Sequence, residues 1–393
     1  MFFRYRANLS LAVLFGLLAC RSSTEQPGST PVAGTDRFAT AFWRARATSP
    51  AARGTPATDG VNVYFLDGAH HVFAFDVLSG ALRWQALTSS ASGATYGQAG
   101  CVMTGGIVVC GDRQLVGFDP ATGTRKWSLS GSFGEPIAEF SLFSANGTVY
   151  AGTGFNTMYA VDVASGSIRW GVQPLPAQTA QISFYNPIAD GTNVVAGYTV
   201  FGTPSIGGVV CLDAATGAVR WNAVLPPRTG AHGGGGSTAF WKDRVLAASN
   251  DGQIHALRLS DGSLDFTLAD AGPQPAEVGG GTPVEDTRNL TVQGNILVAG
   301  SENSYITGYD LNTHSVLWRV SNELSSNNAY RLVSDAEFAY TISIGKYLSA
   351  IRIATGVVSW TAGDGNNAAH GAVALWNDHV FVQADSGFYA LRR

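Results

Sequence analysis

An eleven-residue pattern recurs along this chain, and its recurrence limits the possible folds more than any other feature. The pattern begins with a small residue, carries Asp at its third position and a Ser-Gly or Thr-Gly pair in its middle, and ends in Trp. Four copies match it closely: Ala74–Trp84, Gly117–Trp127, Ala160–Trp170 and Cys211–Trp221. Three copies are weaker: Ala256–Phe266, Gly308–Trp318 and Ala350–Trp360. Successive closing aromatic residues are 42 to 52 residues apart, about the length of four β-strands with their turns.

Each copy predicts two antiparallel strands joined by a tight turn. The Asp can accept hydrogen bonds from backbone N–H groups of the turn, and the Gly supplies a positive φ angle. The closing aromatic ring can fill the space between neighbouring sheets, where it would bury about 150–250 Å². The residues expected to have these structural roles are Trp43, Trp84, Trp127, Trp170, Trp221, Phe266, Trp318, Trp360, Asp76, Asp119, Asp162, Asp213 and Asp310.

The weaker copies depart from the pattern at the turn and at its end. Arg258 and Arg352 replace the Asp, His314 replaces the Gly, and Phe266 replaces the Trp. We therefore expect the turns of these units to be looser or stabilised in another way, while the strand pattern is kept.

The two ends of the repeat region complement each other. The last unit contains the strands Val380–Ala384 and Phe388–Arg392, but no Trp strand follows them. Near the start, Ala41–Arg44 is a Trp strand without preceding partners, and Trp43 lies 41 residues before Trp84. Pairing the two ends would remove exposed sheet edges. The sequence thus predicts an all-β fold over residues 38–393: an eight-bladed β-propeller of four-stranded antiparallel blades, closed by the N-terminal strand pairing with the C-terminal blade.

The N-terminus has the features of an export signal. Arg4 and Arg6 precede the apolar run Leu9–Ala19, which is too short to span a bilayer. The run ends in Leu-Leu-Ala before Cys20, which resembles a bacterial lipobox. We expect residues 1–19 to be a signal peptide, Cys20 to be lipidated, and residues 20–37 to be a flexible tether. The alternative is a cleaved signal without a lipid.

The repeat resembles the tryptophan-docking motif of PQQ-repeat propellers, where PQQ stands for pyrroloquinoline quinone. A lipobox followed by eight such blades resembles the BamB family of outer-membrane assembly lipoproteins. That resemblance implies a scaffold without catalytic activity or cofactor, whose partner is a protein, such as a BamA-type barrel. It also implies a place in the bacterial cell envelope, at the periplasmic face of the outer membrane. The net charge of −4 and the lack of a basic run argue against a nucleic-acid partner.

Two other functions remain open. PQQ-dependent dehydrogenases share the repeat, but they are expected to carry adjacent cysteines and an oxygen-ligated Ca²⁺ site, and this chain has neither signature. Neither PQQ nor a metal site is therefore expected. A periplasmic or surface propeller that binds a ligand at the mouth of its channel is the other alternative. The candidate contacts are Arg53, Tyr96, Tyr185, His232, Tyr330 and His370. A solvated channel would explain these residues equally well, and two histidines alone do not make a metal site.

The segment Cys101–Cys110 predicts a hairpin with a two-residue turn at Gly105 and Gly106. Counting outward from the turn pairs Cys101 with Cys110. We expect a disulfide here, in keeping with export to an oxidising compartment. Two buried free thiols are the alternative. Cys211 is expected to be buried and inert.

Overall fold

The computed structural model describes residues 37–46, 54–89, 99–112, 114–129, 137–176, 181–202, 205–226, 235–249, 253–269, 287–301, 305–321, 332–342, 347–363 and 369–393. The predicted signal peptide, Cys20 and the tether up to residue 36 lie outside this part of the chain. Within it, no helix has the length and hydropathy needed to cross a membrane.

The described strands form eight four-stranded antiparallel sheets, numbered here as blades in chain order. Blade 1 contains β2 (Ala57–Thr58), β3 (Asn62–Leu66), β4 (His71–Asp76) and β5 (Leu82–Leu87). Blade 2 contains β6 (Gly100–Thr104), β7 (Ile107–Gly111), β8 (Leu115–Phe118) and β9 (Arg125–Leu129). Blade 3 contains β10 (Ile137–Ala145), β11 (Thr148–Thr153), β12 (Met158–Asp162) and β13 (Ile168–Val172). Blade 4 contains β14 (Ile182–Ala189), β15 (Asn193–Val200), β16 (Ile206–Asp213) and β17 (Val219–Val224).

The second half of the chain repeats this arrangement. Blade 5 contains β18 (Gly235–Trp241), β19 (Arg244–Ser249), β20 (Gln253–Arg258) and β21 (Leu264–Ala269). Blade 6 contains β22 (Thr287–Gln293), β23 (Ile296–Ser301), β24 (Tyr305–Asp310) and β25 (Ser315–Ser321). Blade 7 contains β26 (Val333–Ser334), β27 (Phe338–Ile342), β28 (Leu348–Arg352) and β29 (Val358–Ala362). Blade 8 contains β30 (Ala369–Trp376), β31 (His379–Ala384), β32 (Gly387–Arg392) and β1 (Trp43–Ala45).

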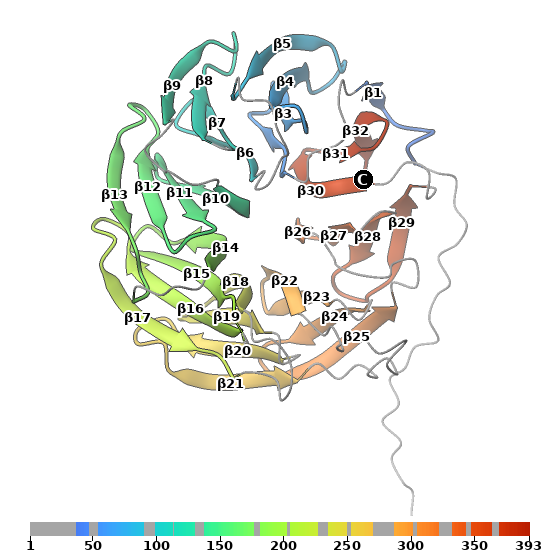
Figure 1. Ribbon diagram of the computed structural model, residues 1–393. Coiled ribbons are helices and arrows are strands. Elements are labelled where there is room, and N and C mark those ends of the chain that lie inside the picture. The colour runs from blue at the N-terminus through green and yellow to red at the C-terminus, as the bar shows by residue number, and fades with distance from the viewer. Residues whose placement is uncertain are drawn as a thin grey trace, which may run out of the picture.

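The blades form a ring around a central channel, and the two ends of the chain close the ring in blade 8 (Figure 1). β1 pairs antiparallel with β32, with Trp43 opposite Ala390 and Ala45 opposite Phe388. The backbone N–H of Phe42 donates a hydrogen bond of 2.8 Å to Ala390 O. The predicted eight-bladed fold and its closure by the N-terminal strand are therefore confirmed.

The burial of each strand follows its position in the blade. Second strands such as β3 and β15 are buried along their whole length, because neighbouring blades cover both faces. The outer strands β5, β13 and β17 keep Trp84, Trp170 and Trp221 buried between mostly exposed neighbours. The hydrophobic core consequently consists of separate layers between blades rather than one central cluster.

Six tryptophans of the outer strands each join their blade to the next one. Their indole N–H groups donate hydrogen bonds of 2.7 to 3.0 Å to a backbone carbonyl in the turn of the following blade. The donor and acceptor pairs are Trp43 and Val77, Trp84 and Pro120, Trp127 and Val163, Trp170 and Ala214, Trp221 and Leu259, and Trp318 and Ile353. Each ring also lies against the glycine of that turn, as Trp127 does against Gly166. We call this paired arrangement the indole lock.

The turn aspartates behave as the sequence indicates. Asp213 Oδ1 accepts hydrogen bonds of 3.0 and 2.9 Å from the backbone N–H groups of Ala215 and Thr216. Its other oxygen accepts one of 2.6 Å from Arg220. The bonds from Arg220 and Thr216 lower the pKa of Asp213 to about 2, so this carboxylate is ionised in neutral solution.

The weaker copies contain compensating exchanges. In blade 5 the ion pair is inverted, because Arg258 occupies the Asp position and bonds to Asp265 at 2.9 Å. Phe266 and His314 replace the Trp and the Gly of the indole lock between blades 5 and 6. Their rings stack with centroids 3.8 Å apart. These turns are stabilised in another way, which is one of the two outcomes that the sequence allowed.

The closing blade lacks a turn after β32, and Arg37 lies in its place. The Arg37 guanidinium lies 4.6 Å from the ring centroid of Trp360 and donates a hydrogen bond of 2.7 Å to Arg392 O. Trp360 Nε1 has no hydrogen-bond partner among the described residues. The N-terminal segment thus covers the last indole from outside the repeat.

Candidate functional site

The central channel contains a cavity of about 550 Å³, lined by the innermost strands of the blades and the residues next to them. Aliphatic side chains such as Ile188, Leu290 and Val333 alternate with hydroxyl and amide groups. None of the described residues that line it is charged. The described part of the cavity surface is therefore neutral and only partly polar.

Hydrogen bonds join the polar lining residues of neighbouring blades. Asn186 Nδ2 donates a hydrogen bond of 2.7 Å to Ser237 Oγ, and the hydroxyl groups of Thr291 and Ser334 are 2.6 Å apart. Asn186 has a φ angle of 43°, at an irregularity in the pairing of β14 with β15. The amide and hydroxyl groups therefore connect blade 4 to blade 5 and blade 6 to blade 7.

The structure tests few of the residues predicted at the channel mouth. Arg53, Tyr96, His232 and Tyr330 lie outside the described residues, and His370 is described only as backbone in β30. Tyr185 lies on β14, but its neighbour Asn186, which the sequence analysis did not select, lines the cavity. Whether the predicted residues form a site at the channel mouth therefore stays a prediction.

A bound PQQ would not fit the described lining. The quinone carries three carboxylates, and the Ca²⁺ that accompanies it needs several convergent oxygen ligands. The described lining contains neither a cationic partner nor a carboxylate. In the described ranges, moreover, no three His, Cys, Asp or Glu side chains come together in a way that could hold a metal ion. We therefore derive no reaction step through this cofactor.

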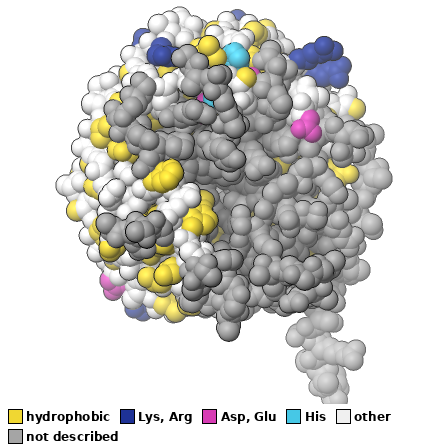
Figure 2. Space-filling view, in the orientation of Figure 1, with side chains coloured by type: hydrophobic (Ala, Val, Ile, Leu, Met, Phe, Trp, Pro, Cys, Tyr) yellow, Lys and Arg dark blue, Asp and Glu magenta, His cyan; other side chains and the backbone are white. Residues whose placement is uncertain are grey.

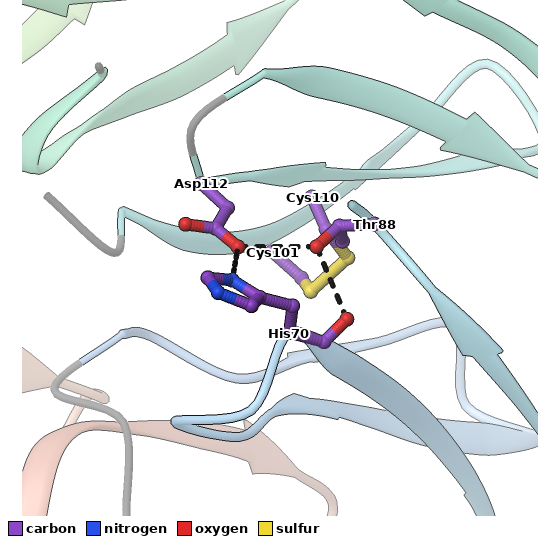
Figure 3. Close-up of a disulfide and its surroundings, with 5 residues drawn as sticks. All are labelled: His70, Thr88, Cys101, Cys110 and Asp112. Carbon is purple, nitrogen blue, oxygen red and sulfur yellow. Dashed lines mark hydrogen bonds and ion pairs between the residues drawn. A yellow bond between two sulfur atoms is a disulfide. The ribbon is translucent and has the colours of Figure 1, made fainter. Parts of the chain in front are cut away.

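A buried polar cluster connects blades 1 and 2 beside the disulfide (Figure 3). His70 Nδ1 bonds to Asp112 Oδ2, and both residues are almost completely buried. Thr88 Oγ1 lies 3.1 Å from both Asp112 Oδ2 and the His70 carbonyl oxygen. No sequence pattern indicates this cluster, because its members come from separate turns without a recurring spacing.

This cluster contains a hydroxyl, an imidazole and a carboxylate, the groups of a catalytic triad. The three groups are not arranged as in a triad, and the contact is structural. In a catalytic triad the imidazole lies between the hydroxyl and the carboxylate, so that it can take the hydroxyl proton. Here Asp112 lies between Thr88 and His70. Thr88 consequently has no adjacent histidine base, and the cluster acts as a clamp between two blades.

The hairpin of β6 and β7 lies beside this cluster. Its strand register is the one predicted from the two-residue glycine turn. Cys101 pairs with Cys110, and their sulfur atoms are joined in a disulfide with Cα atoms 4.1 Å apart. The Cys101 N–H donates a hydrogen bond of 2.8 Å to Thr55 O of blade 1. Cys211 is a buried free thiol, and burial raises its pKa to about 12. This thiol is therefore protonated and a poor nucleophile.

Exposed apolar side chains gather at one end of blades 3 and 4. We call Phe155, Phe201, Ile206 and Val224 the apolar rim, since each is between 42 and 63% exposed. Phe155 lies in the turn between β11 and β12, whereas Phe201 and Ile206 flank the turn between β15 and β16. Figure 2 shows patches of hydrophobic side chains over blades 3 and 4.

Backbone contacts bring the apolar rim together. The N–H groups of Asn156 and Phe201 donate hydrogen bonds of 2.9 and 2.8 Å to Ile182 O and Gln181 O, which places Phe155 and Phe201 on either side of the start of β14. Val224 pairs with Gly208, two residues from Ile206 on the same face of β16. This surface could not be predicted from the sequence, because exposure cannot be recognised in single apolar residues of separate turns.

The family comparison agrees with the repeat architecture. A family model described as "Outer membrane protein assembly factor BamB" matches residues 39–223 and 111–362, which is more than half of the chain. The chain belongs to the BamB family. A search of curated proteins finds no match.

Solved structures share the fold of this BamB-family chain at low sequence identity. BamB from Moraxella catarrhalis is 16% identical with a TM-score of 0.64, and the match covers 89% of this chain and 99% of that one. Quinohemoprotein alcohol dehydrogenase from Comamonas testosteroni is 13% identical with a TM-score of 0.65, covering 92% and 75%. The computationally designed protein Ika8 is 17% identical with a TM-score of 0.65, covering 89% and 100%. These likenesses concern the fold alone.

Proposed function

We propose that this BamB-family protein is a non-catalytic, lipid-anchored scaffold at the periplasmic face of the outer membrane. Its partner is a protein of outer-membrane assembly, a BamA-type barrel, which binds the apolar rim of blades 3 and 4. The observation that carries the proposal is the gathering of Phe155, Phe201, Ile206 and Val224 on one exposed surface.

An exposed cluster of large apolar groups costs free energy in water, and such clusters are typical of protein-binding surfaces. Burying a Phe side chain completely stabilises a complex by roughly 1.5–3 kcal/mol. Phe201 and the neighbour of Phe155, Asn156, are held by backbone hydrogen bonds, which reduces the conformational entropy lost when a partner covers the two rings. The rim thus has the properties of an interaction hot spot.

The proposed anchor follows from the N-terminal sequence. Cys20 ends the lipobox-like segment, and Arg37 is the first described residue, at the edge of blade 8. A lipid on Cys20 would therefore hold the propeller near the membrane surface.

Replacing Phe155 and Phe201 by Ser is expected to reduce the amount of BamA-type barrel that co-purifies with the protein from gently solubilised envelopes by at least tenfold. The matched control carries Leu78→Ser and Leu264→Ser, because these leucines are 57 and 55% exposed and lie outside the rim. The control variant should retain the barrel. Consistent absence of the barrel from the unaltered protein, or equal recovery with both variants, would refute the proposal.

A further inference from the structure

The outer edge of blade 8 carries arginines that form no ion pair with an acidic group among the described residues. Arg44 and Arg46 are exposed on and next to β1, and within the part of the chain that the structure describes neither has a hydrogen-bond or ion-pair partner. Three arginines that precede the Trp of their own outer strand differ in this respect. Arg83, Arg169 and Arg220 each bond to the turn aspartate of their own blade, at 2.5 to 2.6 Å.

The alternation of β1 places these charges beside an aromatic ring. Phe42, Arg44 and Arg46 alternate with Trp43 and Ala45 along the chain, so they project from the same face of the edge strand. Phe42 is 39% exposed, and the Arg392 guanidinium lies 5.1 Å from the centroid of its ring. The result is a continuous basic and aromatic stripe made of Arg392, Phe42, Arg44 and Arg46, which we call the arginine stripe.

The charge of blade 8 is opposite to that of the whole protein. Residues 37–46 and 369–393 contain five arginines and two aspartates, a net side-chain charge of +3, whereas the chain as a whole carries −4. Figure 2 shows Lys and Arg side chains gathered at the upper right, over β1. An anionic partner is therefore attracted to this edge in preference to the rest of the surface.

We propose that the arginine stripe docks the propeller on anionic phospholipid headgroups. The inference deepens the proposed function and rests on it for the choice of a membrane as partner. Cys20 lies 17 residues before Arg37, and a chain of this length reaches at most roughly 60 Å. Arg37 itself contacts Arg392 O, so the proposed tether joins the propeller at the stripe. A second, electrostatic contact beside a lipid anchor strengthens a weak membrane attachment.

Docking through this edge would orient the scaffold. β1 is the outermost strand of blade 8, whereas the apolar rim lies on blades 3 and 4, on another part of the ring (Figure 1). The membrane contact and the protein contact therefore use separate surfaces, and both can form at the same time.

Vesicle binding tests the docking surface separately from the lipid. The probe is the chain from residue 20 onward with Cys20→Ser, which keeps every described strand and carries no lipid. We expect it to sediment with phosphatidylcholine vesicles containing about one-third phosphatidylglycerol, and not with pure phosphatidylcholine vesicles. Because each arginine near an anionic surface contributes about fivefold to partitioning, the Arg44→Gln and Arg46→Gln double variant should bind about 25-fold more weakly.

The matched control carries Arg83→Gln and Arg169→Gln on the outer strands of blades 1 and 3, and it should bind within twofold of the probe. Binding that is independent of phosphatidylglycerol, or that is equal for the two double variants, would overturn the proposal. The mass of the unaltered mature protein shows separately whether Cys20 carries a lipid. Co-purification of the barrel in detergent tests the scaffold role separately, because no membrane is present there for the arginine stripe to bind.

Discussion

Replacing Gly166 by Ala is expected to destabilise the propeller by about 2–5 kcal/mol, whereas Gly147→Ala should cost only about 1–2 kcal/mol. Both glycines have a φ angle of 70°, so the backbone strain of a side chain is the same at both positions. A Cβ atom on Gly147 meets nothing within 4 Å, but one on Gly166 would lie 2.4 Å from Trp127 Cγ. The difference between the two variants thus isolates the indole lock.

The Trp127 ring cannot move away from a new methyl group at residue 166. Its Nε1 donates a hydrogen bond of 2.8 Å to Val163 O, and its six-membered ring also lies against Gly117, where a Cβ would be 2.4 Å from Cε2. Thermal or urea unfolding of both variants checks the prediction. Equal losses of stability would show that the indole contact contributes nothing beyond the backbone conformation.

Removing the carboxylate of the clamp between blades 1 and 2 should have the second large effect. Asp112→Ala leaves the buried His70 Nδ1 without its partner, and breaking a buried pair in this way costs about 3–5 kcal/mol. The control is Asp243→Ala, since the Asp243 side chain is 80% exposed and its pair with Arg244 contributes at most about 1 kcal/mol.

Urea or thermal unfolding of the Asp112 and Asp243 variants compares their losses of stability. Asp112→Asn should recover part of the loss, because an amide oxygen can still accept hydrogen bonds from His70 and Thr88. If Asp112→Ala were no more destabilising than Asp243→Ala, the clamp would not hold the two blades together.

The sequence was sufficient for the features that recur or that depend on local pairing. The spacing of the tryptophans predicted eight blades, and the unpaired Trp strand at Ala41–Arg44 predicted how the ring closes. The two-residue turn at Gly105 and Gly106 predicted the pairing of Cys101 with Cys110. These features succeed because their partners are fixed by the strand register or by the repeat itself.

Contacts between blades that occur once could not be predicted in this way. His314 and Phe266 looked like two unrelated departures from the pattern, although they are partners across one interface. His70 and Asp112 come from turns of different blades, and neither position recurs in the repeat. Their pairing depends on how two turns are brought together by the whole ring.

The candidate surfaces were missed for a related reason. Phe155 and Phe201 are 46 residues apart, and only the packing of blade 3 against blade 4 makes them neighbours. Arg44 follows the Trp of its strand, whereas Arg83 and Arg169 precede theirs and pair with the aspartate of their own turn. Exposure and unneutralised charge are properties of the assembled fold.

A double-mutant cycle at Phe266 and His314 tests the central claim most directly. The claim is that an outer ring and the following turn form one interchangeable unit at every blade interface except that of blade 7 with blade 8. Phe266→Trp alone should overpack against His314, and His314→Gly alone should lose the stacked ring, each costing about 1–3 kcal/mol. The double variant recreates the lock of Trp221 and Gly262. The account predicts that it regains about 1–3 kcal/mol relative to the sum of the single losses, as measured by urea unfolding. Additive losses would contradict it.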